Sequence, residues 1–446
     1  MSRANSRPIG LTFNPPALAS LGLKPMQTQH ERQCLVTRYA PKHLSGNKTM
    51  VKQRGEHCPG CTRQELAYMT NSANTRIGVG IVGASADRGW GGIAHVPALR
   101  ALDAYQIRAV STTRMESAKA TASRLGADLA FDTHQALVLR PEVDLVVVAV
   151  KVPDHKQIVS DALAAGKMVY CEWPLARNLS EAEALEGLAR ERQVRTVIGL
   201  QGGLHPPIRY LHHLVRQGVI GMPLSTSIRA HLNDDMWVGR YDPPFEYMAR
   251  AENGATLQSI MLGHALQPLA HVLGAFESLS AIVANQRGDG VRISDGTSLA
   301  KDAPDEMVVA GVLEGGIVTS LHYSAGQSAG LVWEIQGTEG SLRVETASGY
   351  IHFGDMTITL RRGSEPVEQL QVPPAYAAPD LQLEAPAAGV ARLYAQLAAD
   401  LRDGTIDAPD FAVALDRHRV LQAITQAAET GRRQHLSQPD LVNSNR

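Results

Sequence analysis

The chain has 446 residues, 44% of them hydrophobic, which is enough for two or three domains with sizeable cores. Its net charge of −1 gives no reason to expect nucleic acid or an anionic membrane as a partner. Four cysteines are too few for a disulfide framework, and no apolar run approaches the length of a membrane helix. We therefore expect a soluble, cytoplasmic globular protein.

Residues 1–74 lack sustained periodicity and are expected to be a disordered basic extension, with ten Lys or Arg against three Asp or Glu in residues 1–68. Cys58-Pro59-Gly60-Cys61 has redox or half-zinc spacing, but no further ligand pair accompanies it, so no metal is expected. The scarcity of acidic residues is compatible with an organelle transit peptide, but the segment has no clear amphipathic helix. Met69, seven residues before the first expected strand, is the start that we favour.

A strand over residues 76–82 runs into a turn of small residues. A G-x-G-x-x-G pattern falls on Gly78, Gly80 and Gly83, but that register puts the first two glycines inside the strand. The turn should instead begin at Gly83 and close at Gly91-Gly92, with a helix starting near Ile93, so that backbone can approach a pyrophosphate at the helix N-terminus. The residues expected around the pyrophosphate are Gly83, Ala84, Ser85, Trp90, Gly91 and Gly92.

Strands and helices then alternate. Strands are expected at 106–110, 143–150, 168–171 and 195–200, and helices at 114–125, 154–165 and from a capping box at Ser180 and Glu183 to about residue 192. Gly126 and Gly166 suit the ends of the first two helices. This order predicts an α/β fold with a doubly wound parallel sheet, a Rossmann domain over residues 75–200, with ligand at the carboxyl ends of the strands.

The residues after the second strand bear on cofactor choice. An acid there normally binds the adenosine ribose and repels a 2′-phosphate, but this chain has Thr112, Thr113 and Arg114. Hydroxyls and a guanidinium suit a phosphate, so NADP is slightly favoured over NAD.

Strands dominate after residue 201. A helix at 205–217, a strand at 223–231 and a helix at 257–273 precede strands at 279–286, 307–313, 317–323, 332–336, 341–345 and 356–360. Glu314-Gly315-Gly316 and Gly337-Thr338-Glu339-Gly340 are hairpin signals. Helices at 388–401 and 411–430 close the chain. Residues 201–435 are thus expected to form an α+β domain with a large, mainly antiparallel open sheet, followed by a tail at 436–446.

Five separated segments of the chain carry recognisable motifs. They are Val150-Lys151-Val152-Pro153-Asp154-His155, Cys171-Glu172-Trp173-Pro174, Leu200-Gln201-Gly202, Leu262-Gly263-His264 and Ala303-Pro304-Asp305. These motifs resemble those of the family of glucose–fructose oxidoreductase, inositol dehydrogenase and MocA, closest to its branch of fungal galactose-pathway repressors. The resemblance covers about residues 76–435 and implies that Lys151, Glu172, Trp173 and Gln201 bind NAD(P). It also implies a sugar- or polyol-like ligand and a homodimer formed through the C-terminal sheet.

The chain departs from the family at the residues that would move a proton. Family enzymes use the lysine of Glu-Lys-Pro and an aspartate four residues before a histidine, on one helix face. Here the lysine position is Trp173 and the aspartate position is Ile260, while His264 fills the histidine position. Neither tryptophan nor isoleucine can transfer a proton at neutral pH. His264 is the main catalytic candidate, and weaker substitutes are His205, His231 and Tyr247.

Two functions follow from this pattern. The first is an NAD(P)-dependent oxidoreductase with a modified acid/base set. The second is a dinucleotide-binding regulator without turnover, similar to the fungal repressor. The usual activity of the family favours the enzyme, whereas Trp173 and Ile260 favour the regulator. We favour the enzyme by a narrow margin.

Overall fold

The computed structural model describes residues 76–85, 89–377 and 381–436. The expected basic extension, with Cys58 and Cys61, and all of the expected tail except Leu436 lie outside the described residues.

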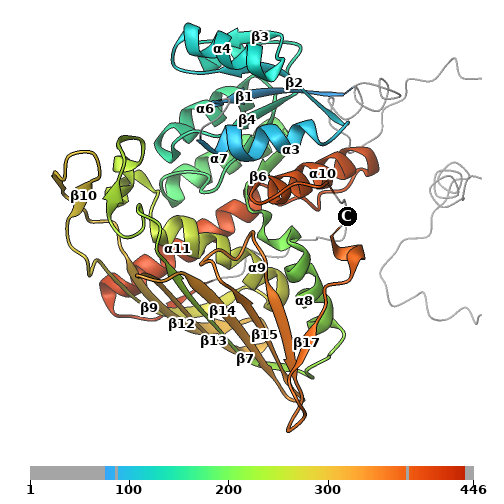
Figure 1. Ribbon diagram of the computed structural model, residues 1–446, viewed down its shortest axis with the longest axis vertical. Coiled ribbons are helices and arrows are strands. Elements are labelled where there is room, and N and C mark those ends of the chain that lie inside the picture. The colour runs from blue at the N-terminus through green and yellow to red at the C-terminus, as the bar shows by residue number, and fades with distance from the viewer. Residues whose placement is uncertain (1–75, 86–88, 378–380, 437–446) are drawn as a thin grey trace, which may run out of the picture. The chain divides into compact units, whose positions relative to one another are not determined.

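Six parallel strands form the N-terminal sheet, in the order β3-β2-β1-β4-β5-β6 (Figure 1). All four residues of β4 are buried, as expected for a strand covered on both faces. The expected Rossmann fold is confirmed, and the strand order reverses between β1 and β4, where such sheets bind ligands. The strands are β1 (Ile77–Val82), β2 (Tyr105–Ser111), β3 (Leu129–Phe131), β4 (Leu145–Val148), β5 (Met168–Cys171) and β6 (Thr196–Ile198).

Helices cover both faces of this sheet, and one comes from late in the chain. α10 (Ala387–Asp403) packs against α3 and η2, and its Val390, Leu393 and Tyr394 enter the same apolar core as β1 and β2. Residues far apart in sequence therefore share one core beside the glycine turn. The other helices of this half are η2 (Gly91–His95), α3 (Val96–Arg100), α4 (Met115–Leu125), α5 (His134–Val138), α6 (Val152–Ala164) and α7 (Leu179–Arg192).

Two local predictions differ from the structure. α7 is capped by Asn178, whose side chain accepts from the backbone N–H of Glu181, and Ser180 lies inside the helix. The capping-box prediction was therefore wrong, because Asn178 can cap as well as a serine. β3 was not anticipated, since three half-buried residues give no readable alternation.

The C-terminal half is built on a nine-stranded sheet in the order β17-β16-β15-β14-β7-β13-β12-β9-β18. Its described pairings are antiparallel except for β7 with β13, and both expected hairpins are present. The mainly antiparallel open sheet is thus confirmed. Its strands are β7 (Pro223–Leu232), β9 (Phe276–Ala284), β12 (Glu306–Leu313), β13 (Ile317–Ala325), β14 (Gly330–Gly337), β15 (Ser341–Thr346), β16 (Thr357–Arg361), β17 (Glu368–Leu370) and β18 (Gln434–His435).

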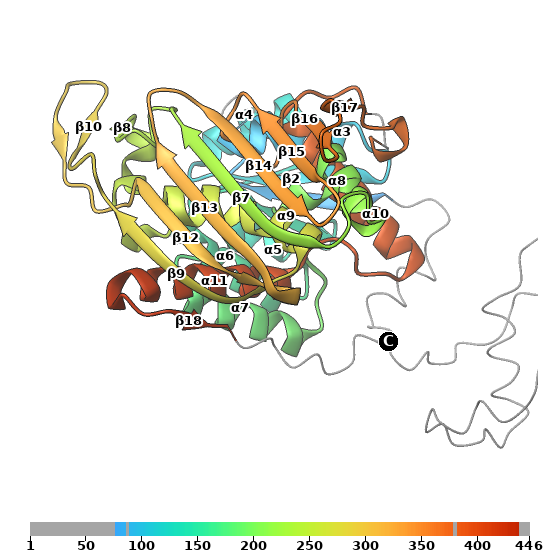
Figure 2. The same ribbon diagram turned by 90° about the horizontal axis from the view of Figure 1, so that it is seen from below.

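One face of this sheet packs on helices and the other is open, as Figure 2 shows. On β13 the odd-numbered residues from Ile317 to Ala325 are buried, whereas Val318 and Ser320 are exposed. The remaining helices are η3 (Gln201–Leu204), α8 (Pro206–Arg216), η4 (Pro243–Ala249), η5 (Ala251–Asn253), η6 (Leu257–Leu262), α9 (Gly263–Leu273), η7 (Glu314–Gly316), η8 (Pro374–Tyr376) and α11 (Phe411–Thr430). Within the described residues, no helix is both long and apolar enough to cross a membrane.

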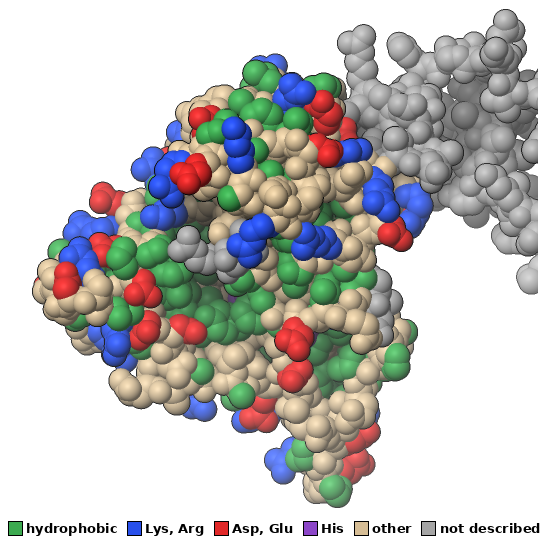
Figure 3. All heavy atoms as spheres, turned by 45° about the horizontal axis from the view of Figure 1, so that its top comes forward, with side chains coloured by type: hydrophobic (Ala, Val, Ile, Leu, Met, Phe, Trp, Pro, Cys, Tyr) green, Lys and Arg blue, Asp and Glu red, His purple; other side chains and the backbone are tan. Residues whose placement is uncertain are grey.

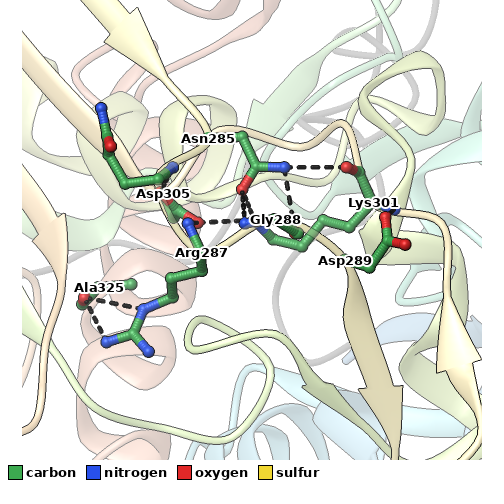
Figure 4. Close-up of polar contacts among 8 residues, drawn as sticks. Asn285, Arg287, Gly288, Asp289, Lys301, Asp305 and Ala325 are labelled. Carbon is green, nitrogen blue, oxygen red and sulfur yellow. Dashed lines mark hydrogen bonds and ion pairs between the residues drawn. The ribbon is translucent and has the colours of Figure 1, made fainter.

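A small three-stranded sheet extends beyond β9, formed by β8 (Arg240–Tyr241), β10 (Gly290–Arg292) and β11 (Ser298–Leu299). A buried ion pair anchors its base, because Lys301 Nζ lies 2.8 Å from Asp305 Oδ2 and 2.7 Å from Asn285 Oδ1 (Figure 4). Asp305 also accepts the backbone N–H groups of Gln286 and Arg287. We call Asn285, Lys301 and Asp305 the lysine cluster.

Candidate functional site

The carboxyl ends of β1, β4, β5 and β6 lie along one edge of the Rossmann sheet. The residues that follow these strands are Gly83, Lys151, Glu172 and Gln201, all expected to bind cofactor. The structure therefore brings together one predicted residue from each of four segments. Figure 3 shows this side of the molecule, where hydrophobic side chains line a hollow.

Gly83 makes the turn after β1 possible. Its φ is +90°, and a Cβ there would lie 2.6 Å from Ala149 O and 2.5 Å from Val150 Cγ1. Gly78 and Gly80 lie inside β1, as predicted. The helix begins earlier than expected: Trp90 already has helical backbone angles, and π-helical hydrogen bonding runs from Gly91 to His95, so Gly91 and Gly92 lie inside the helix and do not precede it.

The segment after β2 places a cation beside the turn into α4. Thr112 Oγ1 donates to Arg114 O at 2.9 Å and lies 2.6 Å from Ser117 Oγ. Arg114 and Thr113 are exposed, and Arg114 makes no ion pair with any residue that the structure describes. A guanidinium in this position is available to an anionic ligand.

Lys151 and Tyr247 meet at the end of β4. Lys151 Nζ lies 5.1 Å from the centroid of the Tyr247 ring, a cation–π distance. Burial, with the charge of Asp154, raises the pKa of Tyr247 to about 12. Tyr247 is therefore a neutral hydroxyl at physiological pH, next to a cation.

Trp173 is packed away from solvent against the helix that carries His264. Its Nε1 donates to Ser259 O at 2.8 Å, and its ring lies 4.9 Å from that of His418 on α11. A Cβ on Gly263 would lie only 2.6 Å from Trp173 Nε1, so the helix and the indole fit without a gap. The indole supplies shape at this position and no titratable group.

Three buried imidazoles meet beside Gln201, and we call His205, His264 and His352 the histidine cluster. The rings of His264 and His352 stack with centroids 3.8 Å apart, and His205 Nε2 bonds Gly354 O at 3.0 Å. The Nδ1 atoms of all three histidines are buried without a hydrogen-bond partner among the described residues. Both amide atoms of Gln201 are likewise unpartnered.

The histidine cluster is uncharged at neutral pH. Burial lowers the pKa of His264 to about 3 and, with the charge of Arg392, lowers the pKa of His205 to about 4. Burial and the other two imidazoles lower the pKa of His352 well below its usual range. Neutral imidazoles can both donate and accept, so together with Gln201 they match a ligand with several hydroxyl groups.

His352 was missed by the sequence reasoning. It follows β15 in the irregular segment 350–354, whose Phe353 stacks on Tyr350 and lies 6.4 Å from Trp90 of the glycine turn. Irregular backbone has no periodicity to read, and a short run of aromatic residues was the only signal. The segment brings the C-terminal sheet into contact with both the glycine turn and His264.

Two expectations about proton-transfer groups are corrected. His231 alternates with the buried residues of β7 and contacts Ser324 and His322 of β13, so it lies on the opposite sheet face and does not join the site. Ile260 lies in the π-helical turn η6, so a spacing of four to His264 no longer implies a shared face. Within the described residues, no group of three His, Cys, Asp or Glu side chains is placed to hold a metal ion.

The chain matches two family models. Residues 77–200 match the oxidoreductase family with an NAD-binding Rossmann fold, and residues 206–346 match the C-terminal domain of Gal80p. Dehydrogenase aclE of Aspergillus oryzae is 34% identical over 291 residues, covering 62% of this chain and 79% of the relative. The galactose/lactose metabolism regulatory protein GAL80 of Saccharomyces cerevisiae is 29% identical over 320 residues, covering 66% and 72%.

Solved structures share the fold. A super-repressor mutant of Gal80p from Saccharomyces cerevisiae superposes with a TM-score of 0.72 at 24% identity, covering 81% of this chain and 98% of that one. Levoglucosan dehydrogenase in complex with NADH and levoglucosan gives a TM-score of 0.69 at 18% identity, covering 82% and 100%. The relatives thus include both dehydrogenases and a transcriptional regulator.

Proposed function

Because the chain belongs to the oxidoreductase family of glucose–fructose oxidoreductase, inositol dehydrogenase and MocA, we propose that it transfers hydride between NAD(P) and a sugar- or polyol-like substrate. The observation that carries this proposal is the histidine cluster. Buried polar atoms are rarely left unpaired in native proteins, so the three histidines and Gln201, whose atoms have no partner among the described residues, support a ligand beside the end of β6. A carbohydrate offers hydroxyls that can both donate to and accept from them.

The residues present fit a dinucleotide. The turn at Gly83, Ala84, Ser85, Trp90, Gly91 and Gly92 would hold the pyrophosphate, and Thr112, Thr113 and Arg114 the adenosine ribose or its phosphate. Lys151, Glu172, Trp173 and Gln201 would hold the nicotinamide half. When bound, the cofactor supplies the hydride acceptor or donor.

We assign transfer of the substrate hydroxyl proton to the histidine cluster. The lowered pKa keeps His264 neutral, and its Nδ1 has no partner among the described residues, so Nδ1 is the atom that would receive the hydroxyl proton as the substrate carbon gives up hydride. Trp173 excludes water from this side, and its indole cannot compete for the proton. His205 and Tyr247 are the substitutes, and His231 is not one, because it lies on the far side of the sheet.

A second candidate is a dinucleotide-binding regulator without turnover. Trp173 and Ile260 favour it, since they replace two groups with which family enzymes move protons. The match to the Gal80p C-terminal domain also favours it. Cofactor binding is common to both candidates, so turnover distinguishes them.

Three finer proposals accompany the function. We propose that NADP binds at least as well as NAD, that the protein acts in the cytoplasm and that the open sheet face forms a homodimer. Apolar side chains on neighbouring strands support the last proposal, since Ile282, Val308 and Val318 are 69%, 39% and 59% exposed.

The decisive experiment identifies the nucleotide bound to the purified protein and then measures hydride transfer with a panel of sugars and polyols. Gly83→Val serves as the control, because its side chain would meet Ala149 O and should weaken cofactor binding more than about tenfold. Binding without turnover on any substrate would establish the regulator instead. The absence of NAD(H) and NADP(H) binding would refute both candidates.

A further inference from the structure

We propose that Tyr394 and His95 are positioning residues that hold the Glu172 carboxylate in place for the cofactor. α10, more than 200 residues away in sequence, would then be part of the cofactor-binding machinery. This inference rests on the cofactor binding proposed above but not on turnover.

The side chains of Tyr394, His95 and Glu172 contact one another in a buried row. His95, the last residue of η2, is fully buried, with Nε2 2.9 Å from Glu172 Oε1 and Nδ1 2.7 Å from the Tyr394 hydroxyl. The Glu172 side chain, 12% exposed, is the member that reaches the strand-end edge. This row of side chains thus runs from α10 through η2 to the end of β5.

The order of these three side chains decides which group donates and which accepts in each contact. A nitrogen 2.9 Å from a carboxylate oxygen carries the proton, so His95 has its N–H at Nε2, although not aimed straight at Glu172, and Nδ1 is left to accept. Burial raises the pKa of Tyr394 well above its usual range, so the phenol keeps its proton and donates to Nδ1. Removing the Tyr394 hydroxyl would free the imidazole that faces Glu172.

The surroundings fix the carboxylate without using all of its hydrogen-bonding capacity. Tyr170 stacks on Tyr394 and meets His95 edge-on, which encloses the imidazole in aromatic rings. A Cβ on Gly199 would lie 2.7 Å from Glu172 Oε2, so backbone of the segment after β6 packs against the other oxygen. The contact with His95 is short but bent, and Oε1 has no linear hydrogen bond among the described residues. A carboxylate that is held but not saturated can accept from a ligand hydroxyl.

Tyr394→Phe tests the proposal, with Tyr105→Phe as the matched control. Tyr105 belongs to the same aromatic group, but its hydroxyl donates to the backbone oxygen of Tyr394 at 2.7 Å. Calorimetry should show NAD(P) binding to Tyr394→Phe weakened about 5- to 10-fold and to Tyr105→Phe changed less than about 2-fold, because one hydrogen bond is worth roughly 1 kcal/mol.

A second pair of variants separates positioning from packing. His95→Gln keeps a donor and an acceptor, so its affinity for NAD(P) should stay within about 3-fold of wild type. The affinity of His95→Leu should fall about tenfold or more. Equal losses in both tyrosine variants, or unchanged binding by His95→Leu, would overturn the inference. If wild type binds no dinucleotide, the proposed function fails and this inference fails with it. If it binds without turnover, the tests apply unchanged.

Discussion

The lysine cluster and the histidine cluster are both buried polar groups of the C-terminal half, but they differ in how their atoms are paired. In the lysine cluster, Lys301 bonds Asp305 and Asn285, and Asp305 accepts two backbone N–H groups as well (Figure 4). In the histidine cluster, three Nδ1 atoms have no partner among the described residues. The described residues pair every member of the lysine cluster, whereas we propose that a ligand pairs the histidine cluster.

The difference separates structure from function. A buried polar group without a partner costs stability, and folding alone gives no reason to keep one. The lysine cluster anchors the small sheet of β8, β10 and β11, whereas the histidine cluster lies beside the strand ends where a dinucleotide would bind. Damage to the two clusters should therefore appear in different measurements.

The largest effect is expected from His264→Ala. Loss of the proposed base should lower the kcat of the folded protein by roughly 10²- to 10⁴-fold. Steady-state kinetics on the best substrate of the panel measures this, and His271→Ala, an exposed histidine on the same helix, is the control. Turnover that survives in His264→Ala would remove this residue from the mechanism and point to His205 or Tyr247.

Asp305→Ala should act on stability and hardly on the site. It leaves the Lys301 ammonium buried and unpaired, which should cost about 3–5 kcal/mol in urea unfolding. The control Asp302→Ala removes a half-exposed ion pair with Arg250 and should cost less than about 1 kcal/mol. A cost for Asp305→Ala no larger than for the control would show that the lysine cluster does not anchor this region.

Acid should destabilise the protein through the histidine cluster. The pKa of His264 is about 3 in the folded state against 6.5 as the ordinary value, so the unfolded state binds more protons below pH 6.5. The stability due to the neutral imidazole is complete above pH 6.5 and is lost as pH falls toward 3. Between pH 7 and pH 4.5, the free energy of unfolding of His264→Gln should therefore fall by roughly 2–3 kcal/mol less than that of wild type. Urea unfolding at each pH measures this difference, and an equal loss of stability in the two proteins would contradict the low pKa.

The smallest effect extends the comparison to surface charges. Arg108 pairs with Asp128 at 3.0 Å, whereas Arg114 has no ion pair among the described residues, so only Arg114 should respond to a ligand. Arg114→Ala should weaken NADP binding about tenfold relative to NAD, and Arg108→Ala should affect neither selectively. Equal losses of NAD and NADP in Arg114→Ala would show that this arginine does not read the phosphate.

Local signals in the sequence were sufficient for the two large sheets, but not for the short strand β3 or the small sheet of β8, β10 and β11. Valine-rich strands alternating with helices that end at glycine predicted the Rossmann sheet, and two glycine-containing hairpins predicted the open sheet. Both patterns depend on near neighbours, because periodicity and turn chemistry act over a few residues. The same reading located the strand ends that carry Gly83, Lys151, Glu172 and Gln201. It also found the two departures from the family, Trp173 and Ile260, since a replaced residue is visible without coordinates.

Only the tertiary structure decided which distant side chains meet. His352 stacks on His264 from 88 positions away, and Tyr394 reaches His95 from 299 positions away, through contacts that leave no local pattern. His231 was rejected because strand register sets its face, and one step along a strand reverses that face. The sequence by itself therefore determined the scaffold and its cofactor edge. The completed site required the tertiary structure, because packing between remote segments sets which polar atoms are paired and which are left for a ligand.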